Sequence, residues 1–220
     1  PLVSSSAASD VYKRQNVFMV AFRTIPEDST GVAHILEHTV LCGSKKFPVR
    51  DPFFSMLKRS MNTFMNAFTS SDWTAYPFAS HNQKDFDNLL SVYLDSVFFP
   101  NLNELDFAQE GHRLEFSELH NRKSELVNKG IVFNEMKGAM SSVNSILWQT
   151  ITKNLFSNTT YHFNSGGEPE EIVKLTYKHF KDFHETHYHP SNAIFFTFGD
   201  ISAVHHLSLI HISEPTRPLH

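Results

Sequence analysis

The pattern of hydrophobic and polar positions predicts a strand and two helices at the start of the chain. Residues 16–23, NVFMVAFR, show the alternation of a half-buried strand. Turn residues follow, and the apolar stretch that begins at Val32 then predicts a helix. A second, short helix is expected from Pro52, because proline is favoured in the first turn of a helix.

Further along, apolar and polar residues alternate over 62–80 on both sides of SSD, which predicts a β-hairpin. Helical spacing predicts helices over 83–99, 104–119, 131–156 and 169–187, and the apolar run AIFFTF at 193–198 predicts a closing strand. This order predicts an α+β fold, in which helices pack on a mixed, largely antiparallel sheet.

The two ends of the chain lack this periodicity. Residues 1–15 are rich in serine and alanine, and residues 205–220 contain two prolines. Both segments resemble translated cloning or sequencing adaptor, so we predict that they are non-native and set them aside as one would a tag. Residues 16–204 contain no internal repeat or low-complexity linker, and we expect one domain there.

Composition narrows the class of protein. A formal net charge of -4 gives no basic field, so nucleic acid is not an expected partner. The apolar runs are shorter than the roughly 20 residues that span a bilayer, so we expect a soluble protein without membrane insertion. Cys42 has no second cysteine with which to pair, which favours an intracellular location.

The stretch HILEH carries the strongest candidate chemistry. His34 and His38 are four residues apart and would share one helix face, so that both imidazoles could bind one metal ion. Glu37 leans towards the same side, which gives the HxxEH order that inverts the commoner HExxH motif. Two histidines on an ordinary helix remain the alternative at this point, since the motif alone is short.

A catalytic zinc usually has three protein ligands, so another residue must supply the third. Glu135 lies in the apolar stretch GIVFNEMKGAM, where a lone carboxylate is costly unless it is paired or bound to a metal. The competing ligands Glu110, His112, Glu115 and Glu118 belong to a charge-rich stretch that is more simply interpreted as a solvated face.

Four separated motifs, HILEH, NAFTSSDWTAYPF, FNEMKG and THYHPSNA, together resemble the N-terminal catalytic domain of the pitrilysin family. The resemblance runs from about Asn16 to Val204 and is closest to the presequence protease branch, which includes falcilysin. It implies that His34, His38 and Glu135 bind one Zn²⁺ per chain and that Glu37 is the catalytic base. Glu135 follows His38 by 97 positions, which suits this branch better than other pitrilysin relatives.

The resemblance also implies a substrate site. Asn66 and Ala67 match an exposed edge that takes the substrate peptide as an added strand through main-chain hydrogen bonds, with an ordinary strand as the alternative. An apolar pocket beside the scissile bond is expected from Leu41, Phe53, Phe54 and Leu57, although core packing competes for these side chains.

We expect structural roles, not catalytic ones, for four other side chains. His184, His187 and His189 are expected to cap or pack a helix end. Cys42 is expected to be a small buried side chain, with a redox role as the alternative.

The implied function is a zinc metalloendopeptidase that degrades unfolded peptides such as cleaved organellar targeting presequences, with zinc-activated water as nucleophile and Glu37 as general base. The implied location is the mitochondrial matrix, with a plastid-type organelle as the alternative and no targeting signal in this chain. A processing peptidase that cuts presequences from precursors, or a non-catalytic scaffold subunit, would be the alternative functions.

The resemblance places a C-terminal half of the same protein, and the first strand or two of the domain, outside this chain. We therefore expect an unpaired sheet edge, weak or moderate zinc binding and feeble proteolysis from the chain alone.

Overall fold

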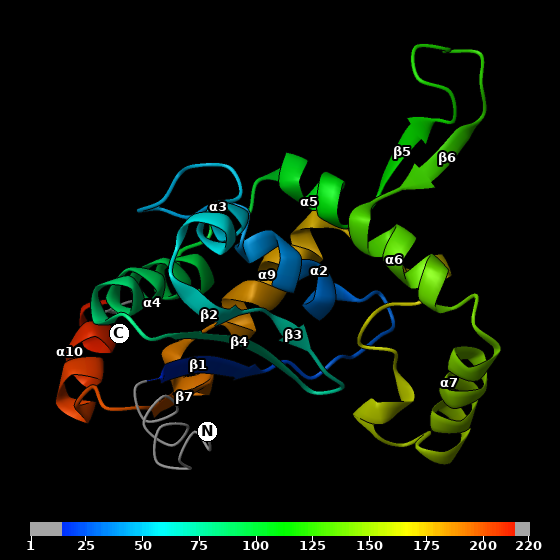
Figure 1. Cartoon of the computed structure of the whole chain (residues 1–220). Helices are drawn as coiled ribbons and strands as arrows, with labels where there is room; N and C mark the ends of the chain where they lie inside the picture. The colour runs from blue at the N-terminus through cyan, green and yellow to red at the C-terminus, as the bar shows by residue number, and fades with distance from the viewer. Residues whose placement is uncertain (1–14, 214–220) are drawn as a thin grey trace, which may run out of the picture.

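The computed structural model describes residues 15–213, whose centre is an antiparallel sheet (Figure 1). Within these residues the strand order is β2-β4-β1-β7, and β3 also pairs with β4. All of these pairs are antiparallel, so the predicted largely antiparallel sheet is confirmed. The strands are β1 (Asn16–Arg23), β2 (Asn62–Met65), β3 (Phe68–Thr69), β4 (Trp73–Ser80) and β7 (Ala193–Phe198).

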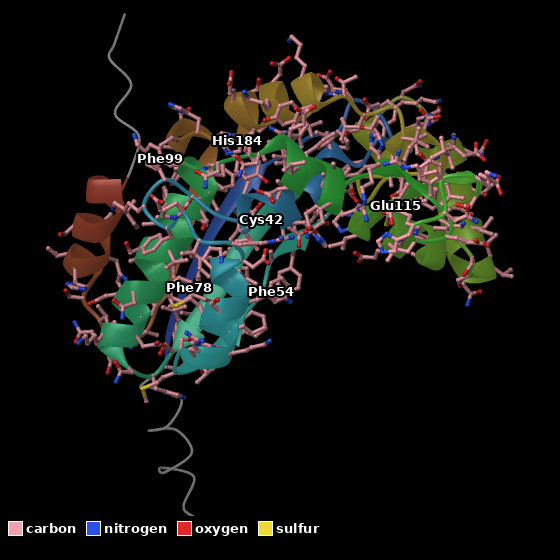
Figure 2. All side chains as sticks on the ribbon, turned by 90° about the horizontal axis from the view of Figure 1, so that it is seen from above. Cys42, Phe54, Phe78, Phe99, Glu115 and His184 are labelled. Atoms are coloured by element: carbon pink, nitrogen blue, oxygen red, sulfur yellow. The ribbon has the colours of Figure 1, made fainter. Side chains whose placement is uncertain are left out.

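Helices cover one face of the sheet and enclose the core (Figures 1 and 2). Alternate residues of β1, among them Phe18 and Phe22, are buried against this layer because successive side chains of a strand point to opposite faces. Tyr76 and Phe78 of β4 join them. The covering helices are α2 (Val32–Val40), α4 (Gln83–Phe98) and α9 (Tyr177–His187).

The remaining elements surround this layer. They are α3 (Pro52–Arg59), α5 (Glu104–Glu110), β5 (Arg113–Phe116), β6 (Leu126–Lys129), α6 (Ile131–Ala139), α7 (Val143–Leu155), α8 (Pro169–Ile172) and α10 (Ala203–Ser213), with short 3-10 helices at Thr160–His162 and Pro190–Asn192. Among the helices of residues 15–213, none combines the length and apolar character that crossing a membrane requires.

One predicted helix is wrong in its second half. The helix expected over 104–119 ends at Glu110, and β5 then pairs with β6 in a separate antiparallel hairpin that projects from the body (Figure 1). Gly111 and Gly130 lie at the base of this hairpin, where a Cβ on Gly130 would stand only 1.9 Å from the Gly111 carbonyl oxygen. The two chain segments can meet there because Gly130 has no side chain.

Two other predicted helices are each divided. Residues 131–156 form α6 and α7, with a break that includes Ser141 and Ser142. Residues 169–187 form α8 and α9, because Thr176 begins a new helix by accepting a hydrogen bond from the backbone N–H of His179.

The segments predicted to be non-native fall mostly outside the described residues, at 1–14 and 214–220. Their adaptor origin stays a prediction. Helix α10 crosses the expected boundary at 204, and its His205 Nε2 lies 2.9 Å from Asp87 Oδ1 of α4. At the sheet edge, β7 pairs with β1 on one side and with no other strand of residues 15–213.

Candidate metal centre

The burial pattern of α2 sets the direction in which HILEH faces. Six of its nine residues are buried, and the half-buried stripe that remains holds His34, Glu37 and His38. These three are spaced by three and four residues, so they lie on one face of the helix. The apolar side of α2 therefore turns both imidazoles towards a common point.

Glu135 of α6 reaches that point. One carboxylate oxygen, Oε2, lies 3.7 Å from His34 Nε2 and 3.8 Å from His38 Nε2. The three ligand atoms all lie within 4.8 Å of one another, the one such group of three among the described residues. The structure thus brings together the three residues that the sequence analysis predicted as metal ligands.

The other ring nitrogen of each histidine has an oxygen acceptor. His34 Nδ1–H donates to the carbonyl oxygen of Gly166 at 3.0 Å, and His38 Nδ1 lies 3.2 Å from Glu110 Oε2. Since a carbonyl and a carboxylate can only accept, both protons belong on Nδ1. Each Nε2 then presents a lone pair towards Glu135.

The charges around His38 favour a cation at this place. Burial works against the charged imidazolium, but the hydrogen bond to Glu110 and the nearby charges of Glu37, Glu110 and Glu135 outweigh it and raise the pKa of His38. A proton or a metal ion between the two Nε2 atoms and the Glu135 carboxylate would relieve the repulsion between the nitrogen lone pairs and that carboxylate.

The donor set fits zinc. Two neutral imidazoles and one carboxylate are a ligand combination of catalytic zinc sites, and ligands about 2.0 to 2.1 Å from one tetrahedral ion stand roughly 3.3 Å apart. The observed separations of 3.7 and 3.8 Å from Glu135 need only a small inward movement. The Nδ1 contacts to oxygen are the outer interactions that usually orient zinc-bound histidines.

The apolar surroundings predicted for Glu135 are wrong, although its position beside the histidines fits a ligand. Its side chain is 54% exposed, so the cost of burying a lone carboxylate does not apply. Val132 and Phe133 take the buried side of α6, and Glu135 faces the histidines instead.

The interpretation of Glu110 as part of a solvated face is also wrong. Its side chain is only 8% exposed and contacts His38. Sequence reasoning missed this role. The other competitors lie elsewhere: His112 contacts the Leu175 carbonyl, and Glu115 pairs with Lys129 and Arg113 on the hairpin, away from Cys42 at the end of α2 (Figure 2).

A cavity of about 440 Å³ opens beside His38 and Glu37. Every residue predicted for substrate binding lines it. Phe54 and Leu57 are exposed on α3 rather than packed in the core, and Phe54 is visible there in Figure 2. The lining includes Glu37, His38, Leu41, Cys42, Phe53, Phe54, Leu57, Met65, Asn66, Ala67 and Glu110.

The backbone at Asn66 and Ala67, between β2 and β3, is already partly paired. Asn66 N–H donates to the Pro77 carbonyl, and the Asn66 carbonyl accepts from the Tyr93 hydroxyl. Ala67 N–H donates to Asn66 Oδ1 at 3.0 Å. A peptide that binds Ala67 N–H must therefore displace the Asn66 side chain.

The three histidines that were expected at a helix end, and Cys42, have structural surroundings. His184 is buried and its Nε2–H donates to the Val97 carbonyl, while His187 contacts the Phe183 carbonyl and His189 contacts Ser191. These contacts agree with the expected packing and capping of a helix end. Burial raises the pKa of the Cys42 thiol, which keeps it protonated.

Comparison with known proteins identifies two family models in the chain. Residues 23–142 match the model described as insulinase, peptidase family M16, and residues 174–211 match the M16 inactive domain. His34, Glu37, His38, Glu110 and Glu135 all lie in the first match.

Close relatives are mitochondrial presequence proteases. The protein of that name from Xenopus laevis is 60% identical over 196 residues, which cover 89% of this chain and 19% of the relative. The mouse and Schizosaccharomyces pombe proteins are 57% and 50% identical, over 90% and 92% of this chain. The chain thus spans about a fifth of the length of these relatives.

Solved structures show the same fold at low identity. A protease from Helicobacter pylori has a TM-score of 0.71 at 22% identity and covers 91% of this chain, which matches 45% of that protein. Pitrilysin has a TM-score of 0.65 at 18% identity, covering 89% of this chain and 20% of pitrilysin. The family model spans more than half of the chain and includes the candidate metal centre, so the chain belongs to peptidase family M16, the insulinase and pitrilysin family.

Proposed function

We propose that this chain is the catalytic domain of a zinc metalloendopeptidase that degrades unfolded peptides, including cleaved targeting presequences. The observation that carries the proposal is the convergence of two Nε2 atoms and Glu135 Oε2, with both Nδ1 atoms engaged by oxygen acceptors. One Zn²⁺ per chain, held by His34, His38 and Glu135, accounts for this arrangement.

A zinc ion bound there would act as a Lewis acid on the scissile carbonyl and make water acidic enough to attack near neutral pH. Glu37 lies on the same face of α2 and lines the cavity where a peptide would lie. It would take the proton from the attacking water and deliver it to the departing amine. Glu110 would hold His38 in the tautomer that presents Nε2.

The cavity supports a peptide substrate. Leu41, Phe53 and Phe54 would contact an apolar side chain next to the cleaved bond. The backbone of Ala67 would pair with the peptide once Asn66 Oδ1 is displaced, so that recognition depends little on substrate sequence.

Substrate class and location are proposed from the relatives. Their names, mitochondrial presequence protease, support presequence peptides as substrates and the mitochondrion as the location, within which we propose the matrix.

A partner region of the same protein is proposed from the relatives' greater length. Helix α7 supports it, because none of its residues is buried and its apolar side chains, such as Leu147 and Trp148, are exposed.

The decisive experiment compares Glu37→Gln with the unchanged chain. Zinc content should stay near one per chain, because Glu37 is not a ligand. Cleavage of an unfolded presequence peptide, which is expected to be feeble in the chain alone, should fall by about 10²- to 10⁴-fold, the usual contribution of a general base. Glu170→Gln, at an exposed position on α8, is the matched control and should change neither.

Elemental analysis after dialysis against metal-free buffer supplies the second readout. Glu135→Ala should lose zinc. If the unchanged chain binds no zinc while it is folded, or if Glu37→Gln still cleaves at the original rate, the proposal fails.

A further inference from the structure

The loop Asn164–Gly167, sequence NSGG, contacts the metal centre from far along the chain. The Gly166 carbonyl oxygen accepts the His34 Nδ1–H at 3.0 Å, across 132 positions of sequence. This acceptor is a backbone atom, so its position depends on how the loop is held rather than on the side chain at 166.

The side chain of Asn164 holds the loop. Asn164 Oδ1 accepts the Gly166 N–H at 3.1 Å, and the Asn164 carbonyl accepts the Gly167 N–H at 3.0 Å. Asn164 is only 5% exposed, so water competes little for these bonds. The Gly166 carbonyl shares its peptide group with the Gly167 N–H, which the Asn164 backbone holds. The Asn164 side chain binds on both sides of that group, because Oδ1 accepts the Gly166 N–H and Nδ2 donates to the Gly167 carbonyl at 3.4 Å, and so keeps the Gly166 carbonyl directed at His34.

The loop is also tied to the segment that begins α2. Ser29 Oγ accepts the Asn164 N–H at 3.1 Å, and the Ser29 carbonyl accepts the Glu168 N–H at 2.8 Å. The backbones approach so closely that a Cβ on Gly31 would stand 2.7 Å from the Gly166 carbonyl oxygen. The loop is therefore held directly against the start of helix α2.

The second ligand-bearing helix touches the same loop. A Cβ on Gly166 would stand 3.0 Å from the thioether of Met136, the residue after Glu135 on α6. The loop thus contacts both helices that carry the proposed ligands.

We propose that Asn164 is a positioning residue of the metal centre. Through Gly166 it fixes the His34 ring in the tautomer and orientation that present Nε2 to the metal, as Glu110 does for His38. The consequence for zinc rests on the proposed function, whereas the effect on the His34 ring does not need a metal.

The test measures histidine tautomers in the zinc-free chain by long-range ¹H–¹⁵N NMR, at a pH where the imidazoles are neutral. In the unchanged chain His34 and His38 should both carry the proton on Nδ1. In Asn164→Ala, His34 should shift to a mixture of tautomers while His38, held by Glu110, stays unchanged. Asn158→Ala replaces an exposed asparagine that precedes the loop by a few residues, and it should change the tautomer of neither ring.

Zinc affinity, measured by competition with a chelator, is the second readout. Asn164→Ala should weaken it by about 10- to 100-fold, the usual effect of losing an outer-shell contact. If Asn164→Ala does not fold, Ser29→Ala carries the same test with a smaller shift, because it removes only the anchor of Asn164.

Two results would overturn the inference: a His34 ring that keeps its Nδ1 proton, or equal changes at His34 and His38, which would indicate general loosening. Failure of the unchanged chain to bind zinc would instead contradict the proposed function.

Discussion

The two imidazoles of the candidate metal centre have unlike acceptors. His34 donates to a neutral carbonyl, and His38 faces the carboxylate of Glu110. A carboxylate acceptor makes the opposite ring nitrogen more basic, so His38 should be the stronger zinc ligand of the two.

We predict that Glu110→Gln weakens zinc binding by about 10- to 100-fold. Glutamine can still accept the Nδ1–H bond, but it removes the charge that supports His38. In the zinc-free chain the pKa of His38 should fall, because the hydrogen bond and the charge of Glu110 both raise it. Chelator competition and NMR titration measure the two effects.

Glu104→Gln is the control for this change, because Glu104 is exposed on the same helix, α5. Equal zinc affinity in the two variants would show that the charge of Glu110 does not act on the centre.

The period of a helix predicted that His34, Glu37 and His38 share one face, and the family resemblance then predicted their roles at a zinc site. Glu110 could not be found this way, because its burial comes from the packing of α5 against α2 and not from its own charged surroundings. Gly166 acts through a backbone atom, which leaves no signature in the choice of side chain.

Among the elements, those with a long, regular pattern were predicted well. Strand β1, helix α4 and the 62–80 hairpin agree with the structure. The hairpin of β5 and β6 was missed because each strand has only four residues and none of them is buried, so no buried face imposes an alternation.

Two glycines on the ligand-bearing helices should respond oppositely to alanine. Gly31 begins α2 with φ 68°, and a Cβ there would meet the Gly166 backbone, so Gly31→Ala should destabilise the fold by at least about 1–2 kcal/mol. Gly138 lies within α6, and a Cβ there meets nothing within 4 Å. Gly138→Ala should therefore stabilise the fold by about 0.5–1 kcal/mol.

Urea unfolding of the zinc-free chain measures both free energies. Because Gly138→Ala is the same chemical change on the other helix, it serves as the control. A Gly31→Ala chain as stable as the original would mean that α2 and the loop at 164–167 do not approach as closely as described.

For the whole molecule, the candidate metal centre joins segments that are distant in sequence. His34 and Glu135 lie on different helices, and unfolding separates them. A ligand that binds only the folded chain stabilises it, by about 2.7 kcal/mol at a free concentration of 100 times its dissociation constant.

Zinc should therefore raise the melting temperature by about 5–10 °C at that concentration, since 1 kcal/mol corresponds to about 2–4 °C in a chain of this size. Calorimetry with and without a chelator measures the shift. His38→Ala should abolish it, and His81→Ala, at an exposed position, should retain it. A shift of equal size in His38→Ala would place the zinc at another site.

The projecting hairpin has a practical consequence. The chain leaves the body at Gly111 and returns at Gly130, where the two backbones touch, so Glu110 and Glu135 are brought together whatever length of chain lies between. The distance in sequence between Glu110 and Glu135, the two acids that lie near His38, is then set by the length of the hairpin and not by the geometry of the candidate metal centre. The hairpin tip, at 117–125, consequently offers an attachment point for a fluorophore or an affinity handle that leaves the chemistry of the centre untouched.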